Sequence, residues 1–328
     1  MTQYILAPLS FLFALYFTPQ AIKIANVYGM LDRPDGKLKT HKEPVPYLGG
    51  IAVFLSFMLS LSLLYNLNKE ILGFLFASTI ILFTGFVDDL INLSPLSKLL
   101  GEFLAIWILL RADIRIKIAA LPDWLAIFTT IVWILVISNG FNLIDIMDGL
   151  AGAISFFSYI SFAFIAIIFN AKTTALVGLS LAGAVLGFLL YNLPPAKIYL
   201  GDTGSLFLGF SLATISIMVD YTAINPLGYF VPLFFLWIPI FEVAFVSIIR
   251  VLKGINPLKG SPDHFPFRLA IVLGSKLKAL ELITILHFTI CLWGIIIVKQ
   301  TAGFTLYSMA MLFILSTAVG ILISRVKV

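Results

Sequence analysis

The stretch at residues 71–94 reads ILGFLFASTIILFTGFVDDLINLS, in which a run of mainly apolar residues ends at two adjacent aspartates. Such a run approaches the roughly 20 residues that cross a bilayer as a helix. Carboxylates beside hydrocarbon are costly unless they are paired, hydrated or bound to a metal, so Asp88 and Asp89 are candidate functional residues. The same pattern, a long apolar run that adjoins a short polar stretch, recurs along the chain.

The composition is that of a membrane protein. The chain has 328 residues, of which 61% are hydrophobic and 11% are charged, whereas soluble proteins carry roughly a quarter charged residues. Continuous apolar runs favour helices over a β-barrel, whose strands alternate apolar and polar residues. The one cysteine lies inside an apolar run and supports neither a disulfide nor a thiolate metal site. We therefore expect an all-α, polytopic transmembrane bundle that forms a single integral-membrane domain over residues 1–328.

Apolar length and the positions of proline, glycine and charge predict about eleven transmembrane helices. Their ranges are 4–26, 48–66, 70–87, 97–111, 123–139, 149–169, 173–192, 204–219, 228–249, 279–298 and 302–323. If the N-terminus lies outside, fifteen of the 21 Lys and Arg residues fall on the cytoplasmic side, as the positive-inside rule requires. The C-terminus is then cytoplasmic too. Because these loops explain the net positive charge, we expect no nucleic-acid binding.

Five polar stretches hold nine of the sixteen carboxylates, and this topology places all five in cytoplasmic loops. They span 31–43, 86–89, 139–148, 197–202 and 261–268. The Lys and Arg side chains nearby are suited to binding phosphate. Sites built from hard oxygen ligands bind Mg²⁺ or Mn²⁺ in preference to zinc. The sequence therefore predicts one carboxylate-rich site at the cytoplasmic face of the membrane.

Three aspartates are the candidates for the chemistry. Asp88 and Asp89 are adjacent and repel each other, a property that suits a general base or a Mg²⁺ site. The alternative interpretation is that the two carboxylates only mark a hydrated helix terminus. Asp202 lies in KIYLGDTGS, residues 197–205, at the start of the eighth predicted helix, whose N-terminus favours anions. This stretch has no Walker A pattern. We expect Asp202 to hold Mg²⁺ that bridges phosphates, with a simple capping turn as the alternative.

A row of amides and carboxylates recurs every three residues at Asn139, Asn142, Asp145 and Asp148. On a helix this spacing places neighbours on one face, so the last three can point into one cavity. Such a row can bind a sugar or nucleotide, or hold a cation through oxygen ligands. Capping of the next helix is the competing explanation for Asp148, although it covers that residue alone.

Four motifs resemble those of the polyprenyl-phosphate N-acetylhexosamine-1-phosphate transferases, which are glycosyltransferases of family 4. They occur in the family's order and cover nearly the whole chain: DRPDGKLKTHKEPVPYLGG at 32–50, DDLINLSPLSKLLGE at 88–102, NGFNLIDIMDGLAG at 139–152 and PAKIYLGDTGSLFLGF at 195–210. The resemblance implies Mg²⁺-dependent transfer of a sugar 1-phosphate, expected to be GlcNAc-1-phosphate, from a UDP-sugar to polyprenyl (undecaprenyl) phosphate. UMP leaves, and the polyprenyl-pyrophosphate sugar initiates synthesis of a cell-envelope glycan.

The resemblance also implies where the enzyme lies in the cell and which roles its residues have. The enzyme would lie in the plasma (inner) membrane with its active site facing the cytoplasm, and a homodimer is allowed for. Asp202 would be the main Mg²⁺ ligand, Asp88 would orient or deprotonate the lipid phosphate, and Asp89 would assist at the metal or phosphate. The implied substrate contacts are His41, Lys42 and Lys98 to phosphates, Asn142, Asp145 and Asp148 to the nucleotide sugar, Asn192 and Tyr199 around the nucleoside, and His264 and Arg268 to phosphate or sugar.

The last large cytoplasmic loop departs from the family pattern. Relatives that transfer GlcNAc-1-phosphate usually have H-x-H-H-R, where this chain has HFPFR at 264–268, and Glu242 replaces the usual Asp of the ninth helix. The nearest alternative is the peptidoglycan branch, which uses UDP-MurNAc-pentapeptide and generally has a histidine-rich loop that this chain lacks. A cation transporter is a second alternative, for which we would expect acids spread through the bilayer depth and inverted repeats.

Overall fold

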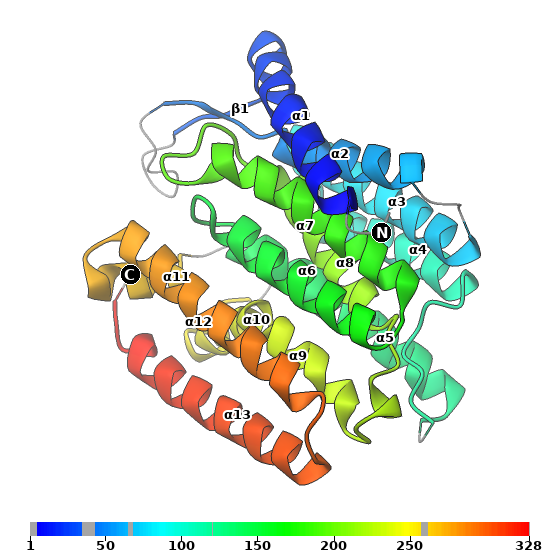
Figure 1. The fold of residues 1–328 in the computed structure, drawn as a ribbon. Coiled ribbons are helices and arrows are strands. Elements are labelled where there is room, and N and C mark those ends of the chain that lie inside the picture. Colours follow the sequence, from blue (N-terminus) through cyan, green and yellow to red (C-terminus); the bar gives the residue numbers. More distant parts are fainter. Residues whose placement is uncertain (1–4, 35–42, 65–67, 120, 257–261, 328) are drawn as a thin grey trace. The chain divides into compact units, whose positions relative to one another are not determined.

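A computed structural model describes residues 5–34, 43–64, 68–119, 121–256 and 262–327. The described residues are mostly helical, and they form two compact units, Met1–Val219 and Asp220–Val328 (Figure 1). The prediction of an all-α fold is therefore confirmed. The only strands in the described part of the chain are two residues long each.

The first unit contains eight helices within the described residues. They are α1 (Leu6–Tyr28), α2 (Gly49–Leu64), α3 (Lys69–Ile91), α4 (Pro95–Arg111), α5 (Asp123–Ile144), α6 (Leu150–Ile168), α7 (Lys172–Asn192) and α8 (Gly201–Ser216). Between α1 and α2, β1 (Leu31–Asp32) pairs antiparallel with β2 (Val45–Pro46).

Helix α8 is the core of this unit. Every residue from Thr203 to Ser216 is buried, and the helix packs against α3, α5, α2 and α6. Phe207 meets the ring of Phe54 edge-on, with centroids 5.2 Å apart. Around this core α7 packs against α1 and α6, and α4 packs against α3. A helix that is apolar on all sides is typical of the centre of a bundle, and here its N-terminal end is enclosed by helices that carry the polar motifs.

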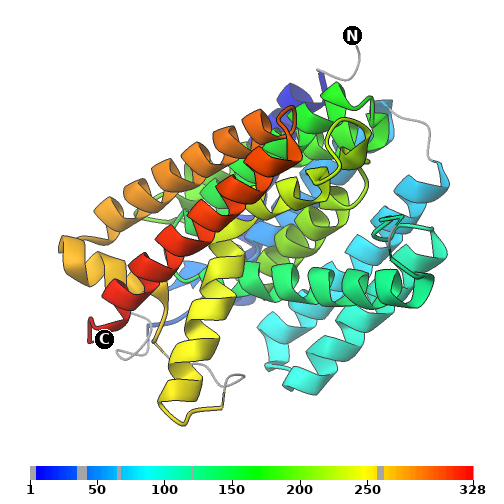
Figure 2. The same ribbon diagram turned by 90° about the horizontal axis from the view of Figure 1, so that it is seen from below.

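The second unit contains two 3₁₀ turns, η2 (Tyr221–Ala223) and η3 (Gly228–Phe230), and five helices within the described residues. These are α9 (Val231–Phe235), α10 (Trp237–Leu252), α11 (Phe265–Leu273), α12 (Lys276–Ile297) and α13 (Ala302–Ser324). Figure 2 shows α12 and α13, in orange and red, running side by side. Helix α12 also packs against α9 and α11.

The single helix predicted over 228–249 is wrong, because the chain bends by 72° between η3–α9 and α10. The break falls at Leu236, between two prolines, Pro232 near the start of α9 and Pro239 in α10. Pro239 has no N–H to donate to the carbonyl of Phe235, which removes a hydrogen bond of a continuous helix at this point. The sequence contains the cause of the bend, although its apolar composition is continuous.

Seven helices among the described residues are long and apolar enough to cross a membrane, or eight if the bent pair is one span. This finding confirms a multi-pass, all-α membrane protein. The count of eleven spans and the orientation of the termini stay predictions.

Candidate active site

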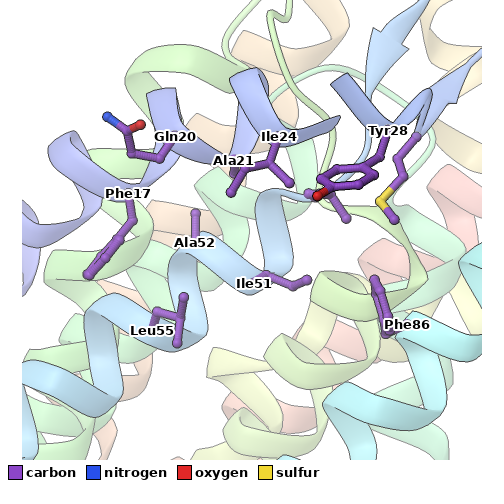
Figure 3. Close-up of a pocket in the computed structure, with 11 residues that line it drawn as sticks. Phe17, Gln20, Ala21, Ile24, Tyr28, Ile51, Ala52, Leu55 and Phe86 are labelled. Carbon is purple, nitrogen blue, oxygen red and sulfur yellow. The ribbon is translucent and has the colours of Figure 1, made fainter. Parts of the chain in front are cut away.

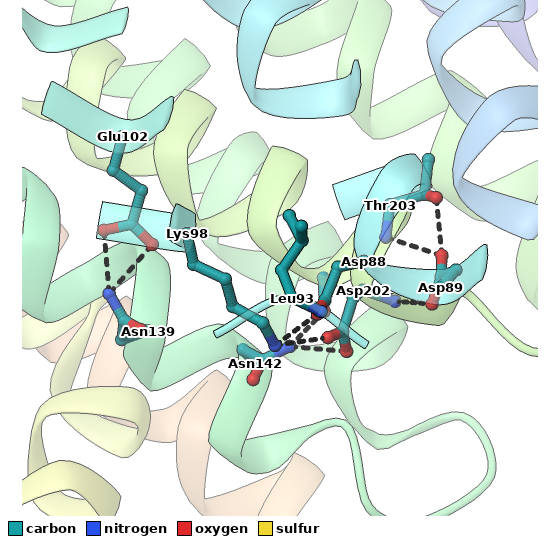
Figure 4. Close-up of polar contacts among 10 residues, drawn as sticks. Asp88, Asp89, Leu93, Lys98, Glu102, Asn139, Asn142, Asp202 and Thr203 are labelled. Atoms are coloured by element: carbon teal, nitrogen blue, oxygen red, sulfur yellow. Dashed lines mark hydrogen bonds and ion pairs between the residues drawn. The ribbon is translucent and has the colours of Figure 1, made fainter. Parts of the chain in front are cut away.

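Lys98 joins two carboxylates that come from different helices (Figure 4). Its ammonium pairs with Oδ2 of Asp88 on α3 and lies 2.9 Å from Oδ2 of Asp202 on α8. The Asp88 side chain is 4% exposed, whereas Lys98 and Asp202 are 29% and 34% exposed. The shared ammonium offsets the repulsion between the two carboxylates. We call Asp88, Lys98 and Asp202 the Lys98 cluster.

The turn between α3 and α4 brings Lys98 back to Asp88. Oδ1 of Asp88 accepts a hydrogen bond from the N–H of Leu93 at 2.7 Å, and Asn92 ends α3 in the left-handed conformation with φ of 52°. Ser94 caps α4, whose first residue is a proline. Lys98 therefore lies in the first turns of α4, within reach of the last turn of α3.

Asn142, on α5, holds the other side of Asp202. Its Nδ2 donates to Oδ1 of Asp202 at 2.9 Å and to Oγ of Ser205 at 3.0 Å. Both oxygens of Asp202 thus have a partner, and the carboxylate stays in the first turn of α8. The end of a helix where N–H groups point outward favours negative charge and bound phosphate.

Asp89 points to the start of α8 and caps that helix from α3. Its Oδ1 accepts from the N–H of Asp202 at 2.8 Å, and its Oδ2 accepts from the N–H and Oγ1 of Thr203 at 3.0 and 2.6 Å. Two glycines permit this approach: Gly201 has φ of 70°, and a Cβ on Gly85 would lie 2.7 Å from Cα of Thr203. The first N–H groups of a helix lack partners within it, so both oxygens of Asp89 serve a structural purpose.

Removing this cap should destabilise the protein. Changing Asp89 to alanine leaves N–H groups of α8 unpartnered, and loss of a capping side chain costs about 0.5–2 kcal/mol. The melting temperature of the purified protein should fall by about 2–4 °C for each kcal/mol lost. Glu281→Ala is the matched control, because it removes an exposed carboxylate from the interior of a helix, α12. If the two variants melt at the same temperature, Asp89 is not a cap.

Asp145 and Asp148 lie in a turn, so the predicted helical row through residue 148 is wrong. Helix α5 ends at Ile144, and α6 begins after Gly149 without a side-chain cap. Oδ2 of Asp148 accepts from the N–H of Ala196 at 3.0 Å, so the capping alternative for this residue is also wrong. The physical reason is Gly149, whose φ of 77° suits glycine and separates the two helices.

The turn lies in the electrostatic field of the other carboxylates. Burial first, and then the charges of Asp202, Asp89 and Asp148, raise the pKa of Asp145 to about 8. Burial and nearby carboxylates, Asp148 first, raise the pKa of Tyr199 to about 12. Both shifts oppose the formation of a further negative charge, for which burial is the larger cause and the neighbouring carboxylates the smaller one.

The raised pKa of Asp145 predicts a pH-dependent stability. Between the ordinary value near 4 and about 8, the folded state binds more protons than the unfolded state, so stability falls as the pH rises through this window. Changing Asp145 to asparagine removes the ionisation. The difference in melting temperature between the variant and the wild type should therefore shift in favour of the variant from pH 6 to pH 9. Thermal melts at four pH values test this, with Asp123→Asn as the control at an exposed carboxylate. A difference between Asp145→Asn and wild type that stays constant with pH would contradict the prediction.

Asn192 and Tyr199 shape the segment that leads into α8. The buried amide of Asn192 donates to the carbonyl of Ile198 at 2.8 Å and accepts from the N–H of Gly149 at 3.1 Å. The main chain of Tyr199 bonds to Pro46 and Gly49, while its side chain is half-buried. Asn192 therefore positions backbone in this structure, and the Tyr199 ring is the better placed of the two to meet a ligand.

Glu102 is a buried carboxylate that the sequence reasoning missed. It lies one turn beyond Lys98 on α4, is 1% exposed, and its two oxygens accept from Nδ2 of Asn139 at 3.1 and 3.0 Å. The prediction started from polar stretches beside apolar runs, and Glu102 falls inside such a run. An ionisable residue in a membrane helix was nevertheless a sufficient signal.

His264 and Arg268 belong to a buried cluster of the second unit. Nδ1 of His264 lies 2.7 Å from Oε1 of Glu242, and Nη2 of Arg268 lies 2.7 Å from Oδ1 of Asp263. The same Asp263 oxygen accepts from Lys253 at 2.5 Å. Glu242, which departs from the family pattern, is thus the residue that orients the His264 ring.

The structure brings one part of the predicted site together in the first unit. His41 and Lys42 lie outside the described residues. Among the described residues, no three His, Cys, Asp or Glu side chains converge as a metal-binding group. The direct contacts join Asp88, Lys98, Asn142 and Asp202, while Asp89, Asp145, Asp148 and Tyr199 lie around them.

In this apolar bundle an amine and several carboxylates meet at the N-terminus of a buried helix, an arrangement suited to phosphate. The fold and the site therefore place the protein in a class, the multi-pass membrane proteins with a phosphate site. The sequence model of glycosyl transferase family 4 matches residues 71–220, the range that contains the Lys98 cluster. A relative from Bacillus subtilis (strain 168) is 30% identical over 317 residues, which are 93% of this chain and 87% of the relative. The chain therefore belongs to glycosyl transferase family 4 and is an enzyme of that family.

The relatives carry two kinds of names. The Bacillus subtilis protein is named probable undecaprenyl-phosphate N-acetylglucosaminyl 1-phosphate transferase. A Thermotoga maritima protein named undecaprenyl-phosphate alpha-N-acetylglucosaminyl 1-phosphate transferase is 33% identical over 71% of this chain and 70% of its own length. A phospho-N-acetylmuramoyl-pentapeptide-transferase from a Thermoanaerobacter species is 33% identical over 74% of this chain and 82% of its own length.

Proposed function

We propose that the chain transfers an N-acetylhexosamine 1-phosphate, in the first place GlcNAc-1-phosphate, from a UDP-sugar to polyprenyl phosphate and releases UMP. The observation that carries this proposal is the Lys98 cluster at the N-terminus of α8, within the range that the family matches. The names of the relatives that align over most of the chain support undecaprenyl phosphate as the acceptor and N-acetylglucosamine 1-phosphate as the group transferred. The product is a polyprenyl-pyrophosphate sugar that serves the synthesis of a cell-envelope glycan.

In the proposed reaction, an oxygen of the lipid phosphate bonds to the sugar-linked phosphorus of the UDP-sugar as the bond from that phosphorus to UMP breaks. The ammonium of Lys98 and the N-terminus of α8 stabilise negative charge on the phosphates. Asp88 orients the attacking phosphate. A phosphate monoester has a second pKa of about 6 and is mostly ionised at neutral pH, so orientation outweighs proton removal.

Mg²⁺, or Mn²⁺ in its place, fits the donor set of this site. Mg²⁺ is commonly bound by one or two carboxylates together with substrate phosphates, and Asp88 and Asp202 supply two carboxylates that meet at Lys98. When bound, the ion offsets the charge of the phosphates and helps to orient them. An anionic nucleotide would otherwise meet an excess of negative charge. The carboxylates of the first unit that create this excess are Asp88, Asp89, Asp148 and Asp202.

The other predicted residues complete the proposed substrate site. Asn142, Asp145 and Asp148 would contact the nucleotide sugar, and Tyr199 would stack on uracil with Asn192 behind it. His41 and Lys42 would contact phosphates, and His264 and Arg268 would contact phosphate or sugar, with a homodimer allowed for. We further propose eleven spans, an external N-terminus, and a site at the cytoplasmic face of the plasma membrane.

The test is an assay on the purified full-length protein in lipid nanodiscs. With UDP-GlcNAc, undecaprenyl phosphate and Mg²⁺, we expect release of UMP and formation of a pyrophosphate-linked lipid. Omitting the lipid phosphate or chelating the metal should abolish release, and added Mg²⁺ should restore it. Turnover with UDP-MurNAc-pentapeptide alone would assign the peptidoglycan branch instead. Absence of UMP release with either donor would contradict the proposal.

A further inference from the structure

A buried hydrogen-bonded pair, Glu102 and Asn139, joins α4 to α5 (Figure 4). The Glu102 side chain is 1% exposed, and both of its oxygens accept from Nδ2 of Asn139. Asn139 also donates to the carbonyl of Leu135, which orients its amide within α5. Burying a carboxylate costs free energy, and apolar side chains of similar volume often replace a buried polar pair without loss of stability. Stability alone therefore does not account for this pair.

The pair lies one helical turn from the two groups that hold Asp202. Lys98 precedes Glu102 by four residues on α4. Asn142 follows Asn139 by three residues on α5. Side chains at these spacings share one face of a helix. From these faces the ammonium of Lys98 and the amide of Asn142 reach different oxygens of Asp202, each at 2.9 Å.

The two helices are held in the bundle in different ways. Helix α5 packs along α8, so Asn142 meets Asp202 across an extensive helix contact, whereas α4 packs mainly against α3 and meets α5 at few points. The Lys98 ammonium stands on a flexible four-carbon stem, so the rotation of α4 decides from where it reaches Asp202. The bond between Glu102 and Asn139 constrains that rotation directly.

We propose that Glu102 is a positioning residue: its bond to Asn139 fixes the rotation of α4 relative to α5 and thereby places the ammonium of Lys98 at Asp202. The inference rests on the proposed function, in which Lys98 and Asp202 act on the substrate phosphates. Displacing a reacting group by about 1 Å can lower a rate by about 10²-fold. Because Lys98 stabilises negative charge during the transfer, loss of the bond should lower kcat more than it raises either KM.

Two substitutions at Glu102 separate the bond from the bulk of the side chain. Glu102→Gln keeps the length and one acceptor oxygen for Asn139, whereas Glu102→Met keeps the length and has no such acceptor. With UDP-GlcNAc and undecaprenyl phosphate, we expect kcat to fall by about tenfold or more in Glu102→Met. In Glu102→Gln it should stay within about threefold of the wild type, because the bond is kept. A wild-type kcat in Glu102→Met, or an equal loss in both variants, would overturn the inference.

A double variant distinguishes positioning from a loss of stability. Glu102→Met leaves the amide of Asn139 without this acceptor, and Glu102→Met/Asn139→Leu removes the amide as well. The double variant should therefore melt at or above the temperature of the single variant, while its kcat stays low. If kcat recovers together with the melting temperature, the pair is merely structural and the inference is wrong.

Tyr159→Phe is the matched control for a buried hydrogen bond between helices. It removes the 2.6 Å bond from Tyr159 to Ser211, between α6 and α8, and should lower the melting temperature without lowering kcat. The apolar pocket between α1 and α2 (Figure 3) is lined by none of the substituted residues, so its lining is the same in every variant. A kcat that falls as far in Tyr159→Phe as in Glu102→Met would contradict the inference.

A distance measurement does not depend on turnover. Nitroxide labels at Leu100→Cys and Val132→Cys, exposed positions of α4 and α5, report the separation of the two helices by pulsed electron paramagnetic resonance. We expect one distance distribution in the wild type and Glu102→Gln, and a shifted or broader one in Glu102→Met/Asn139→Leu. An unchanged distribution in the double variant would exclude the proposed role. A wild type that releases no UMP would instead contradict the proposed function, and the distances would still decide whether the pair fixes α4 against α5.

Discussion

Changing Asp202 to asparagine should reduce the rate of UMP release by about 10³-fold, as the loss of one preorganised charged group at a reacting phosphate can do. Asparagine is nearly isosteric with aspartate, so the start of α8 keeps its shape. The change removes the negative charge that pairs with Lys98 at 2.9 Å and that would hold Mg²⁺ in the proposed site. We expect the loss mainly in kcat, measured with UDP-GlcNAc and undecaprenyl phosphate at several Mg²⁺ concentrations.

Asp123→Asn is the control for this experiment, since Asp123 is 86% exposed at the start of α5 and pairs with Arg115. Its activity should stay within twofold of the wild type. Asp202→Asn also loses the ion pair with Lys98, so its melting temperature is measured as well, and the activities are compared at a temperature well below the melting of both proteins so that a low activity cannot be attributed to unfolding. If this variant keeps more than a tenth of the wild-type rate, Asp202 does not have the proposed role.

The positions of the long helices were predictable from the sequence because the length and hydropathy of the apolar runs determine them. Every predicted range overlaps a helix of the structure, and the disagreements concern short or interrupted elements. Helix α11, nine residues long, was missed because it is too short to be recognised as a span. The bend before α10 depends on one missing N–H at Pro239, which changes the direction of the chain without changing its apolar composition.

The grouping of Asp88, Asn142 and Asp202 in the first unit agrees with the prediction of one polar site, but the separate roles of Asp88 and Asp89 were not predictable. Adjacent residues on a helix point about 100° apart, so one carboxylate faces Lys98 and the other faces the N–H groups of Thr203 and Asp202. Which of the two faces Lys98 depends on the rotation of α3 in the bundle. That rotation is set by packing against α8, including the close approach of Gly85, and spacing in the sequence contains no information about it.

Changing Lys98 to methionine should reduce UMP release by about 10²–10³-fold, because Lys98 is the cation that joins Asp88 to Asp202 and would meet the substrate phosphates. Methionine keeps the length of the side chain and removes its charge. Lys98→Arg should recover only part of the rate, since a planar guanidinium does not occupy the same point between two carboxylates as an ammonium does.

Lys98→Met also tests whether Lys98 balances the charges of the two carboxylates or has a merely structural role. Without the ammonium, Asp88 and Asp202 repel each other, so the variant should melt at a lower temperature than the wild type. Added Mg²⁺ should then raise its melting temperature more than that of the wild type, since a divalent cation can replace the lost charge between two carboxylates. Lys117→Met, at a lysine that is 60% exposed, should change neither quantity.

A Lys98→Met protein with wild-type turnover would exclude Lys98 from phosphate binding. One that is inactive but gains no extra stability from Mg²⁺ would argue against Asp88 and Asp202 as a shared cation site.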